Sequence, residues 1–223
     1  MERTTLQVGT FEVNCSILSE NGAAWIVDPG QDADTLLDFL KGKSLSPAAI
    51  LLTHAHFDHI GAIPALQRAY SDLPVCVHKN DVPAFSHPMN QLPPDYPAIA
   101  RPKNLVELDA GVKIAGLESL TVIETPGHTP GGVCYFFSQP ARRPIAQSNK
   151  QTISQSNNSP LLLSGDTLFA GSVGRTDLPG GDMATLMASL KKLMDLPDDT
   201  LVIPGHGPST TIAAEKAGNP FLQ

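Results

Sequence analysis

The sequence predicts an α/β fold in which two β-sheets pack on each other and helices cover their outer faces. Two observations support this fold class. Short apolar runs, each bounded by Gly, Pro, Asn or Asp, recur along the 223-residue chain as expected for β-strands. The first runs follow one another as in hairpins and the later ones alternate with helical patterns, which favours packed sheets with external helices.

Eight strands and two helices account for these patterns. A helix over 32–41 has Asp32 or Asp34 as a candidate N-cap and three leucines on one face. A helix over 182–195 begins with Asp182 and places Leu and Met side chains on a single stripe that fills the core. The strands are expected at 11–18, 23–27, 48–53, 74–78, 119–124, 132–137, 161–164 and 200–203.

Two segments interrupt this order. Residues 83–104 contain six prolines, too many for regular structure, and are expected to form a surface loop. Residues 139–160 are rich in Gln, Ser and Asn and cannot bury enough apolar surface to offset the entropy of ordering, so we expect a flexible insertion there. A chain of this length is most simply one domain, and we expect a single domain over 1–223 that contains the insertion.

Composition excludes several classes of protein. The net charge of −7 and the pI of about 5.4 argue against a broad basic surface that would bind nucleic acid or anionic membranes. No stretch approaches a membrane-spanning length, and the N-terminus does not have the pattern of a secretory signal. Three widely spaced cysteines (Cys15, Cys76 and Cys134) indicate free thiols in the cytoplasm. The expected partner is a small-molecule substrate, and the expected assembly is a monomer or small homo-oligomer.

Side chains that can ligate a metal follow four of the predicted strands, the first of them within four residues of each strand's end. Ligands at the ends of rigid strands are held more firmly than ligands on free loops. Glycine directly precedes three of these side chains and permits a tight turn. The cluster consists of His54, His56, Asp58, His59, His128, Asp166 and His206.

The chemistry of this cluster predicts two divalent ions, most simply Zn, with Fe or Mn as alternatives. Imidazole and carboxylate ligands suit these metals, and the absence of thiolates argues against a closed structural zinc site. So many ligands in one turn do not converge easily on one ion, whereas two ions take three ligands each and share one carboxylate. Water shared by two such ions supplies hydroxide near neutral pH. His78 and His87 are expected to be ordinary hydrogen-bonded residues.

The order of these residues resembles the metallo-β-lactamase superfamily. The motifs are H-x-H-x-D-H at 54–59, PGHTPGG around His128, SGDTLF around Asp166 and PGHG around His206. The segments VNCSIL, IVDPG, GSVGRTDLPGGD and EKAGNPFL are similar to the small glyoxalase II-like (hydroxyacylglutathione hydrolase-like) branch. The resemblance spans nearly the whole chain. It implies a four-layer αββα sandwich of two mixed sheets with a dinuclear site at one edge.

The resemblance also implies how the ligands are shared. One ion is held by His54, His56 and His128. The other is held by Asp58, His59 and His206, and Asp166 bridges the two.

Three further residues are candidates for the site. Asp28 follows a predicted strand, and a turn would explain it, but the resemblance implies that it orients the ligands as a hydrogen-bond acceptor. Arg175 and Thr176 lie in a Gly-rich loop, where they either face a substrate carboxylate or fix the loop.

These features predict a metal-dependent hydrolase of a small acyl thioester, with S-lactoylglutathione as the model substrate. A hydroxide bridging the two ions attacks the carbonyl, and Asp58 and Asp166 are catalytic as well as ligating. Thiolate is a good leaving group, so no strong general acid is required. Only residues 207–223 follow His206, which leaves no room for the C-terminal helical region that supplies much of the glutathione site in larger glyoxalase II enzymes. The thiol carrier therefore stays open.

Two alternatives stay open as well. Persulfide dioxygenases of the same superfamily have a similar ligand row but hold one iron, here through His54, His128 and Asp166. The other alternative is a non-catalytic, metal-stabilised binding module. Proteins that have lost activity in evolution usually lack some of the ligands, however, and none is missing here.

Overall fold

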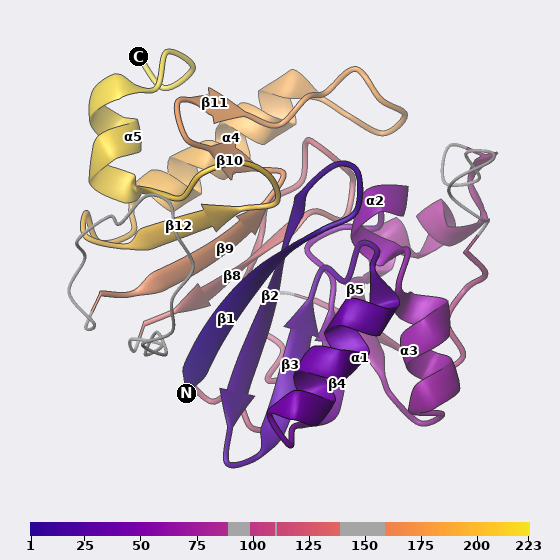
Figure 1. Ribbon diagram of the computed structural model, residues 1–223. Coiled ribbons are helices and arrows are strands. Elements are labelled where there is room, and N and C mark those ends of the chain that lie inside the picture. The colour runs from indigo at the N-terminus through magenta and orange to yellow at the C-terminus, as the bar shows by residue number, and fades with distance from the viewer. Residues whose placement is uncertain (89–98, 110, 139–158) are drawn as a thin grey trace.

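The computed structural model describes residues 1–88, 99–109, 111–138 and 159–223, and two facing mixed sheets form its centre (Figure 1). The first sheet contains, in spatial order, β1 (Glu2–Val8), β2 (Val13–Glu20), β3 (Ala23–Val27), β4 (Ser46–Leu51), β5 (Val75–His78) and β6 (Leu105–Leu108). The second contains β13 (Thr210–Thr211), β12 (Leu201–Pro204), β9 (Leu161–Gly165), β8 (Val133–Phe137) and β7 (Leu120–Glu124). A separate hairpin is formed by β10 (Leu168–Phe169) and β11 (Ser172–Val173).

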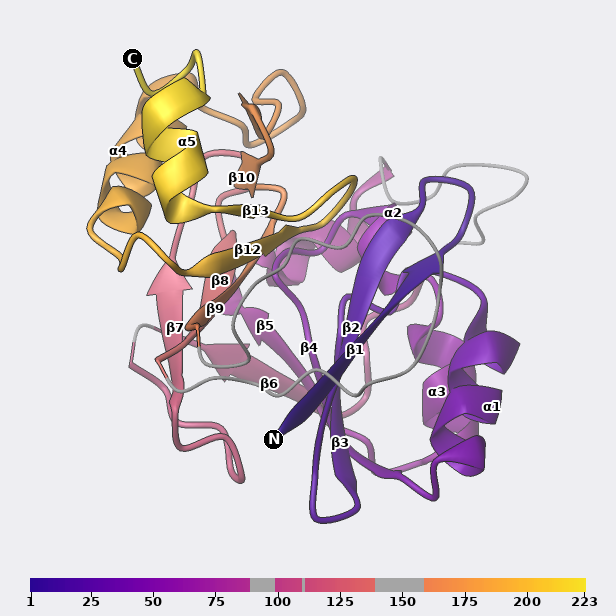
Figure 2. The ribbon, with the colours of Figure 1, turned by 60° about the vertical axis from the view of Figure 1, so that its left-hand side comes forward.

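The helices lie outside the two sheets, as Figure 2 shows. They are α1 (Ala33–Gly42), α2 (Phe57–Ile60), α3 (Ile63–Ala69), α4 (Met183–Met194) and α5 (Ile212–Gly218), with a 3-10 helix η1 (Lys79–Ser86). Leucines of α1 and α3 pack on the outer face of the first sheet. Leucines of α4 and Ile212 of α5 pack on the outer face of the second sheet. The predicted layer order of helix, sheet, sheet and helix is confirmed.

The core between the sheets explains why β3, in the first sheet, is apolar throughout. In β3, Ala24 and Ile26 face the α1 side, whereas Trp25 and Val27 face the second sheet. Successive side chains of a strand point to opposite faces, so a strand covered on both sides needs apolar residues at every position. Tyr135 of the second sheet meets this inner layer and is fully buried.

All eight predicted strands are present, with ends shifted by up to two residues. The shift reaches two residues in β4 and in β2. β2 begins at Val13 because residues 9–12 form the turn that reverses the chain after β1. Both predicted helices are present too, and Asp182 caps α4 by accepting the N–H of Thr185 at 2.7 Å. Asp32 occupies the N-cap position of α1 but makes no cap hydrogen bond, because its carboxylate accepts the N–H of Gly9 at 2.8 Å instead.

The prediction of a surface loop over 83–104 is wrong at its first described end, whereas residues 99–104 form no helix or strand, as expected of a loop. Residues 79–86 form η1, and Phe85 and Ile99 are buried in the core beneath α1 and α3. A 3-10 helix tolerates Pro83 because the residue lies in a short, irregular turn rather than in a long hydrogen-bonded helix. Residues 89–98, and all but the last two residues of the predicted 139–160 insertion, lie outside the described residues.

The unpredicted elements are short or lie at edges. β1 pairs only with β2 and carries mainly polar side chains, so it lacks an apolar run. The helices α2, α3 and α5 have 4, 7 and 7 residues, too few to show a helical period. Within the described ranges, no helix has the length and apolar character needed to cross a membrane.

Candidate metal centre

The segment that follows β4 carries four of the seven predicted ligands. Residues 52–56 cross the edge of the first sheet before α2 begins. His54 and His56 lie in this crossing and are 2% and 5% exposed. Asp58 and the fully buried His59 lie in the single turn of α2. A tight turn directly after a strand therefore places four donor side chains side by side.

The other three predicted ligands follow strands of the second sheet. β7 and β9 are both antiparallel to β8, and β12 is parallel to β9, so β7, β9 and β12 run in one direction. Their carboxyl ends meet at one edge, where His128, Asp166 and His206 follow them. Only glycine fits at Gly205, because a Cβ there would overlap the carboxylate of Asp166. The glycine before His206 thus permits close approach of two ligand-bearing loops.

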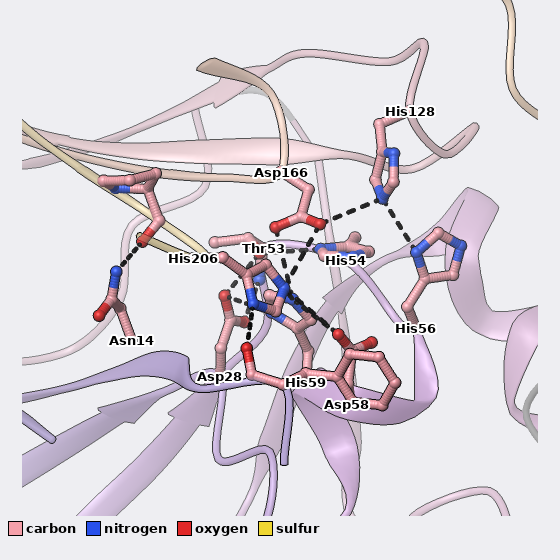
Figure 3. Close-up of polar contacts among 12 residues, drawn as sticks. Asn14, Asp28, Thr53, His54, His56, Asp58, His59, His128, Asp166 and His206 are labelled. Carbon is pink, nitrogen blue, oxygen red and sulfur yellow. Dashed lines mark hydrogen bonds and ion pairs between the residues drawn. The ribbon is translucent and has the colours of Figure 1, made fainter. Parts of the chain in front are cut away.

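The seven side chains converge where the edges of the two sheets meet (Figure 3). They form three groups whose ligand atoms lie within 4.8 Å of one another: His54, His56 and His128; Asp58, His59 and His206; and His54, His59 and Asp166. The Asp166 carboxylate lies 3.4 Å from His59 Nε2 and 3.6 Å from His128 Nε2. It therefore lies between the two three-residue groups, as a bridging ligand would.

Main-chain oxygens hold two of the imidazoles from behind. His128 Nδ1 donates to the oxygen of Arg175 at 2.7 Å, and His206 Nδ1 donates to the oxygen of Phe11 at 2.7 Å. Donation from Nδ1 leaves Nε2 of a neutral imidazole with a free lone pair. Both Nε2 atoms lie on the inner side of the cluster, so these lone pairs are available to a metal.

Several buried imidazole nitrogens at the centre lie close to one another. His56 Nδ1 lies 2.9 Å from His128 Nε2, and His59 Nε2 lies 3.3 Å from His206 Nε2. In the described part of the chain, His54 Nε2 is also buried without a hydrogen-bond partner. Leaving such an atom unsatisfied costs about 1–3 kcal/mol. A divalent cation would satisfy these lone pairs together, and imidazole and carboxylate donors suit Zn or Fe, so the residues fit the metal.

Burial and neighbouring charges shift the pKa values of the cluster in opposite directions. Burial, together with the neighbouring imidazoles, lowers the pKa of His54 well below its usual value and that of His56 to about 3. Burial also lowers the pKa of His59, but the carboxylates of Asp58 and Asp166 raise it more, and the net shift is upward. His54 and His56 are therefore neutral near pH 7, as metal ligands must be.

Asp28 contacts both halves of the cluster. Its Oδ1 accepts the N–H of Thr53 at 2.8 Å, and its Oδ2 accepts the Thr53 hydroxyl at 2.6 Å. The same hydroxyl lies 3.1 Å from His54 Nδ1, and Asp28 Oδ2 lies 3.1 Å from His59 Nδ1. Asp28 thus touches one imidazole directly and the other through a hydroxyl, which agrees with the orienting role expected for it.

Arg175 and Thr176 lie in the loop between β11 and α4. The guanidinium of Arg175 donates through Nε and Nη2 to both carboxylate oxygens of Asp177, each at 2.7 Å. The Arg175 side chain is 62% exposed, whereas its main-chain oxygen holds His128. Both predicted roles of Arg175 therefore remain possible. Its main-chain oxygen fixes the loop beside His128, and its side chain faces outward, where it could meet a substrate carboxylate.

Sequence reasoning missed three residues that shape the centre. Asn14 donates from Nδ2 to the main-chain oxygens of Pro204 and Gly207, both at 2.9 Å, and so holds the loop of His206. Thr53 links Asp28 to His54, and its position directly before a ligand was the available signal. Asp81 is buried behind the cluster, and its sequence context resembles that of any loop carboxylate.

His78 is hydrogen-bonded, as predicted for it. Its Nδ1 accepts the N–H of Asn80 at 3.3 Å, and its Nε2 lies 3.2 Å from Glu124 Oε1. Asp109 lies near enough to complete a possible metal-binding group with His78 and Glu124. However, a neutral ring that accepts at Nδ1 carries its proton on Nε2, so it donates to Glu124 instead of ligating a cation. The N–H of His87 donates to the oxygen of Ala84 at 3.0 Å and closes η1.

Comparison with protein families and curated proteins gives matches over most of the chain. The family model described as the metallo-beta-lactamase superfamily matches residues 8–139 and 154–206, which include all seven predicted ligands. The chain is 37% identical to the probable metallo-hydrolase YqgX of Bacillus subtilis, over 100% of this chain and 98% of that protein. It is 33% identical to the hydroxyacylglutathione hydrolase GloC of Haemophilus influenzae, over 97% of this chain and 96% of that protein.

Solved structures give the same picture. The BLEG-1 B3 metallo-beta-lactamase superposes with a TM-score of 0.80 at 36% identity and covers 99% of both chains. TTHA1623 in a di-iron-bound form superposes with a TM-score of 0.78 at 36% identity, over 98% of this chain and 100% of the other. ETHE1 from Myxococcus xanthus has a TM-score of 0.74 at 26% identity, over 99% and 84% of the two chains.

Proposed function

The chain belongs to the metallo-β-lactamase superfamily, and on that premise we propose that it is a metal-dependent hydrolase of a small acyl thioester, with S-lactoylglutathione as the model substrate. The observation that carries the proposal is the complete set of seven donor side chains, which converge in two groups of three and one shared carboxylate. The thioester part is supported by the relative named as a hydroxyacylglutathione hydrolase, which matches the chain nearly end to end.

The proposed division of the metal-binding residues is the one that the family resemblance implies. The group with His54, His56 and His128 would hold one divalent ion, and the group with Asp58, His59 and His206 would hold another, with Asp166 shared. Such ions, Zn in the simplest case, supply hydroxide near neutral pH and polarise the carbonyl of the substrate.

The two catalytic carboxylates proposed here stay ionised near neutral pH. Burial raises the pKa of Asp58 and Asp166, but the neighbouring imidazoles, His59 foremost, together lower both by more, so the net shift is downward. Asp58 Oδ2 also lies 3.3 Å from His206 Nε2. An ionised carboxylate at this position orients the O–H of an attacking water and accepts its proton. Neither group supplies a strong acid, which suits a thiolate leaving group.

The proposed substrate contacts lie on the loop after β11. A substrate carboxylate near Thr176 would compete with Asp177 for the exposed guanidinium of Arg175. Arg presents paired donors that match the geometry of a carboxylate, so a substrate can replace Asp177 without any change in the backbone that holds His128.

The test compares metal content and thioester hydrolysis in the wild type, His59→Ala and the control His87→Ala. We expect two ions per chain and hydrolysis of S-lactoylglutathione in the wild type and in the control. His59→Ala should bind one ion and lose at least about 100-fold in kcat/KM. The lost ion is the one that would help to supply hydroxide and to stabilise the charge that develops in the transition state. Full hydrolysis by His59→Ala with one ion bound would contradict the dinuclear scheme.

A second candidate is the mononuclear iron persulfide dioxygenase reaction. One observation supports iron as the metal, although with two ions and not one: a 36% identical protein has been solved in a di-iron-bound form. Here His54, His128 and Asp166 would hold the single iron. Protein purified without added metal distinguishes the two candidates. Iron as the main metal, with oxygen uptake on glutathione persulfide, would support this candidate, whereas zinc with thioester turnover would exclude it.

We further propose that the protein works in the cytoplasm on a small molecule, without nucleic acid or a membrane as a partner. Its net charge of −7 and its three buried free cysteines support this setting. Gel filtration would test the expected monomer or small homo-oligomer.

A further inference from the structure

A buried carboxylate outside the set of seven ligands lies behind one of the two metal-binding groups. Asp81, in η1, is 1% exposed. Its Oδ2 accepts the N–H of Ala55 at 3.1 Å and the hydroxyl of Thr129 at 2.8 Å, and its Oδ1 accepts the N–H of Gly131 at 2.6 Å. All three donors therefore belong to loops that carry predicted ligands.

These hydrogen bonds join the two loops that supply the group His54, His56 and His128. Ala55 lies between the first two of these ligands, and Thr129 directly follows the third. One loop leaves the first sheet and the other leaves the second, so strand register within either sheet does not set the distance between them. The carboxylate of Asp81 bonds to both loops at once and so, together with the Val133 N–H that donates to the oxygen of Thr53 at 2.8 Å, fixes that distance.

The residues after His128 are suited to this contact. A Cβ on Gly131 would lie 2.6 Å from both the main-chain nitrogen and Oδ1 of Asp81, closer than any side chain can approach. Thr129 supplies a hydroxyl that points to the same carboxylate. The contacts with Asp81 therefore account for Thr129 and Gly131, for which the seven ligands alone give no role.

We propose that Asp81 is a positioning residue for the ion held by His54, His56 and His128. It holds the two loops at the spacing that lets three imidazoles share one cation. Its negative charge, buried behind them, also favours a cation in front. Among the described hydrogen bonds and ion pairs, none joins Asp81 to Asp58, His59 or His206, so the other ion does not depend on it. The inference rests on the metal-binding part of the proposed function and is independent of the substrate.

The test is the substitution Asp81→Asn. An amide offers one acceptor oxygen, so either Gly131 or the pair of Ala55 and Thr129 loses its acceptor and faces an NH₂ group. Metal-free protein is titrated with Zn²⁺ against a chelating dye, and with Co²⁺ by its visible absorption. We expect the wild type to bind two ions, and the variant to bind one with unchanged affinity and the other about 10–100-fold more weakly. Anomalous scattering from crystals of the variant should place the retained ion at Asp58, His59 and His206.

Two matched variants complete the test. Thr129→Val keeps the shape of the side chain, removes one of the three donors and should weaken the same ion by about tenfold or less. Asp109→Asn replaces an exposed carboxylate that pairs with Lys79 of the same 3-10 helix, and should bind both ions as the wild type does. Asp81→Asn with two wild-type affinities, or with both affinities reduced alike, would overturn the inference.

If Asp81→Asn does not fold, judged by its thermal transition without metal, Thr129→Val decides the question. Wild-type affinity for both ions in that variant would then refute the role of Asp81. A wild-type protein that binds no metal would instead refute the proposed function itself.

Discussion

His128 Nδ1 lies 2.7 Å from the main-chain oxygen of Arg175, so the residue expected at the substrate through its side chain holds a metal-binding imidazole through its backbone. The guanidinium meanwhile pairs with Asp177 and faces outward. The two functions of this residue are thus physically separate. A side-chain substitution removes the charge and leaves the contact with His128 in place.

Arg175→Ala should accordingly raise KM and leave metal content unchanged. We expect an increase in KM of about fivefold for a carboxylate-bearing thioester, since an exposed charge pair is worth about 1 kcal/mol. Steady-state kinetics and metal analysis check this. The control Asp177→Asn frees the guanidinium and should lower KM or leave it unchanged. Loss of metal in Arg175→Ala would show that the side chain, and not the backbone alone, holds the loop.

Asp28→Asn should weaken metal binding although Asp28 is not a ligand. With Asn Oδ1 accepting from the N–H of Thr53, the amide NH₂ donates to the Thr53 hydroxyl, which must then donate to His54 Nδ1. That arrangement moves the proton of the neutral ring to Nε2 and removes the lone pair that faces the centre. We expect a loss of about 10–100-fold in Zn²⁺ affinity, measured by dye competition. Asp38→Asn, on the exposed face of α1, is the control and should bind Zn²⁺ normally.

Tyr135→Phe should destabilise the protein because it removes a hydrogen bond between the two sheets. The buried Tyr135 hydroxyl donates to the main-chain oxygen of Leu52 at 2.7 Å, two residues before His54. Removing the hydroxyl leaves a buried acceptor unsatisfied, and the free energy of unfolding should fall by about 1–3 kcal/mol. Urea denaturation measures the change. Tyr70→Phe, at the half-buried end of α3, should change stability by less than about 0.5 kcal/mol.

The three cysteines should be unreactive in the native protein. Burial raises the pKa of Cys76 and of Cys134 to about 11, and that of Cys15 further still. At pH 8 a thiol with that pKa is ionised to about one part in a thousand, and the thiolate is the reactive form. A thiol reagent should therefore label none of them until denaturant is added. Rapid labelling of the folded protein at pH 8 would contradict the structure.

The same thiols predict an alkaline loss of stability. A pKa raised in the folded state means that the unfolded chain releases its thiol protons first, from the ordinary value of 9.0. Their contribution to stability is fully present below pH 9 and is lost as the pH rises toward 11. Denaturation midpoints across this range check the sign, with a variant carrying Cys76→Ala and Cys134→Ala as the control.

Removal of metal should lower thermal stability. An ion that binds only the folded state at 100 times its Kd adds about 2.7 kcal/mol, which for a chain of this size raises Tm by roughly 5–10 °C. A chelator should remove this increment and Zn²⁺ should restore it, as followed by circular dichroism. Identical melting curves with and without chelator would mean that the seven side chains hold no ion.

Much of this molecule is determined locally in the sequence. The strands covered on both faces are short apolar runs, so β3 was predicted with both of its ends correct. The candidate ligands were predictable for a related reason: each of the four motifs that contain them comes directly after an apolar run or a glycine that the sequence shows. β1 and η1 escaped prediction because an edge strand and a 3-10 turn need no apolar period.

The tertiary structure alone decided which distant groups meet. That Arg175 would hold His128 by its backbone, that Phe11 would hold His206, or that Asp81 would join loops from two sheets depends on how the sheets pack. A main-chain oxygen carries no residue-specific signal, and a carboxylate has the same appearance in a sequence whether it is solvated or buried. The sequence by itself therefore determined the metal-binding side chains and the strands that carry them, while the packing of the two sheets selected the groups that orient them.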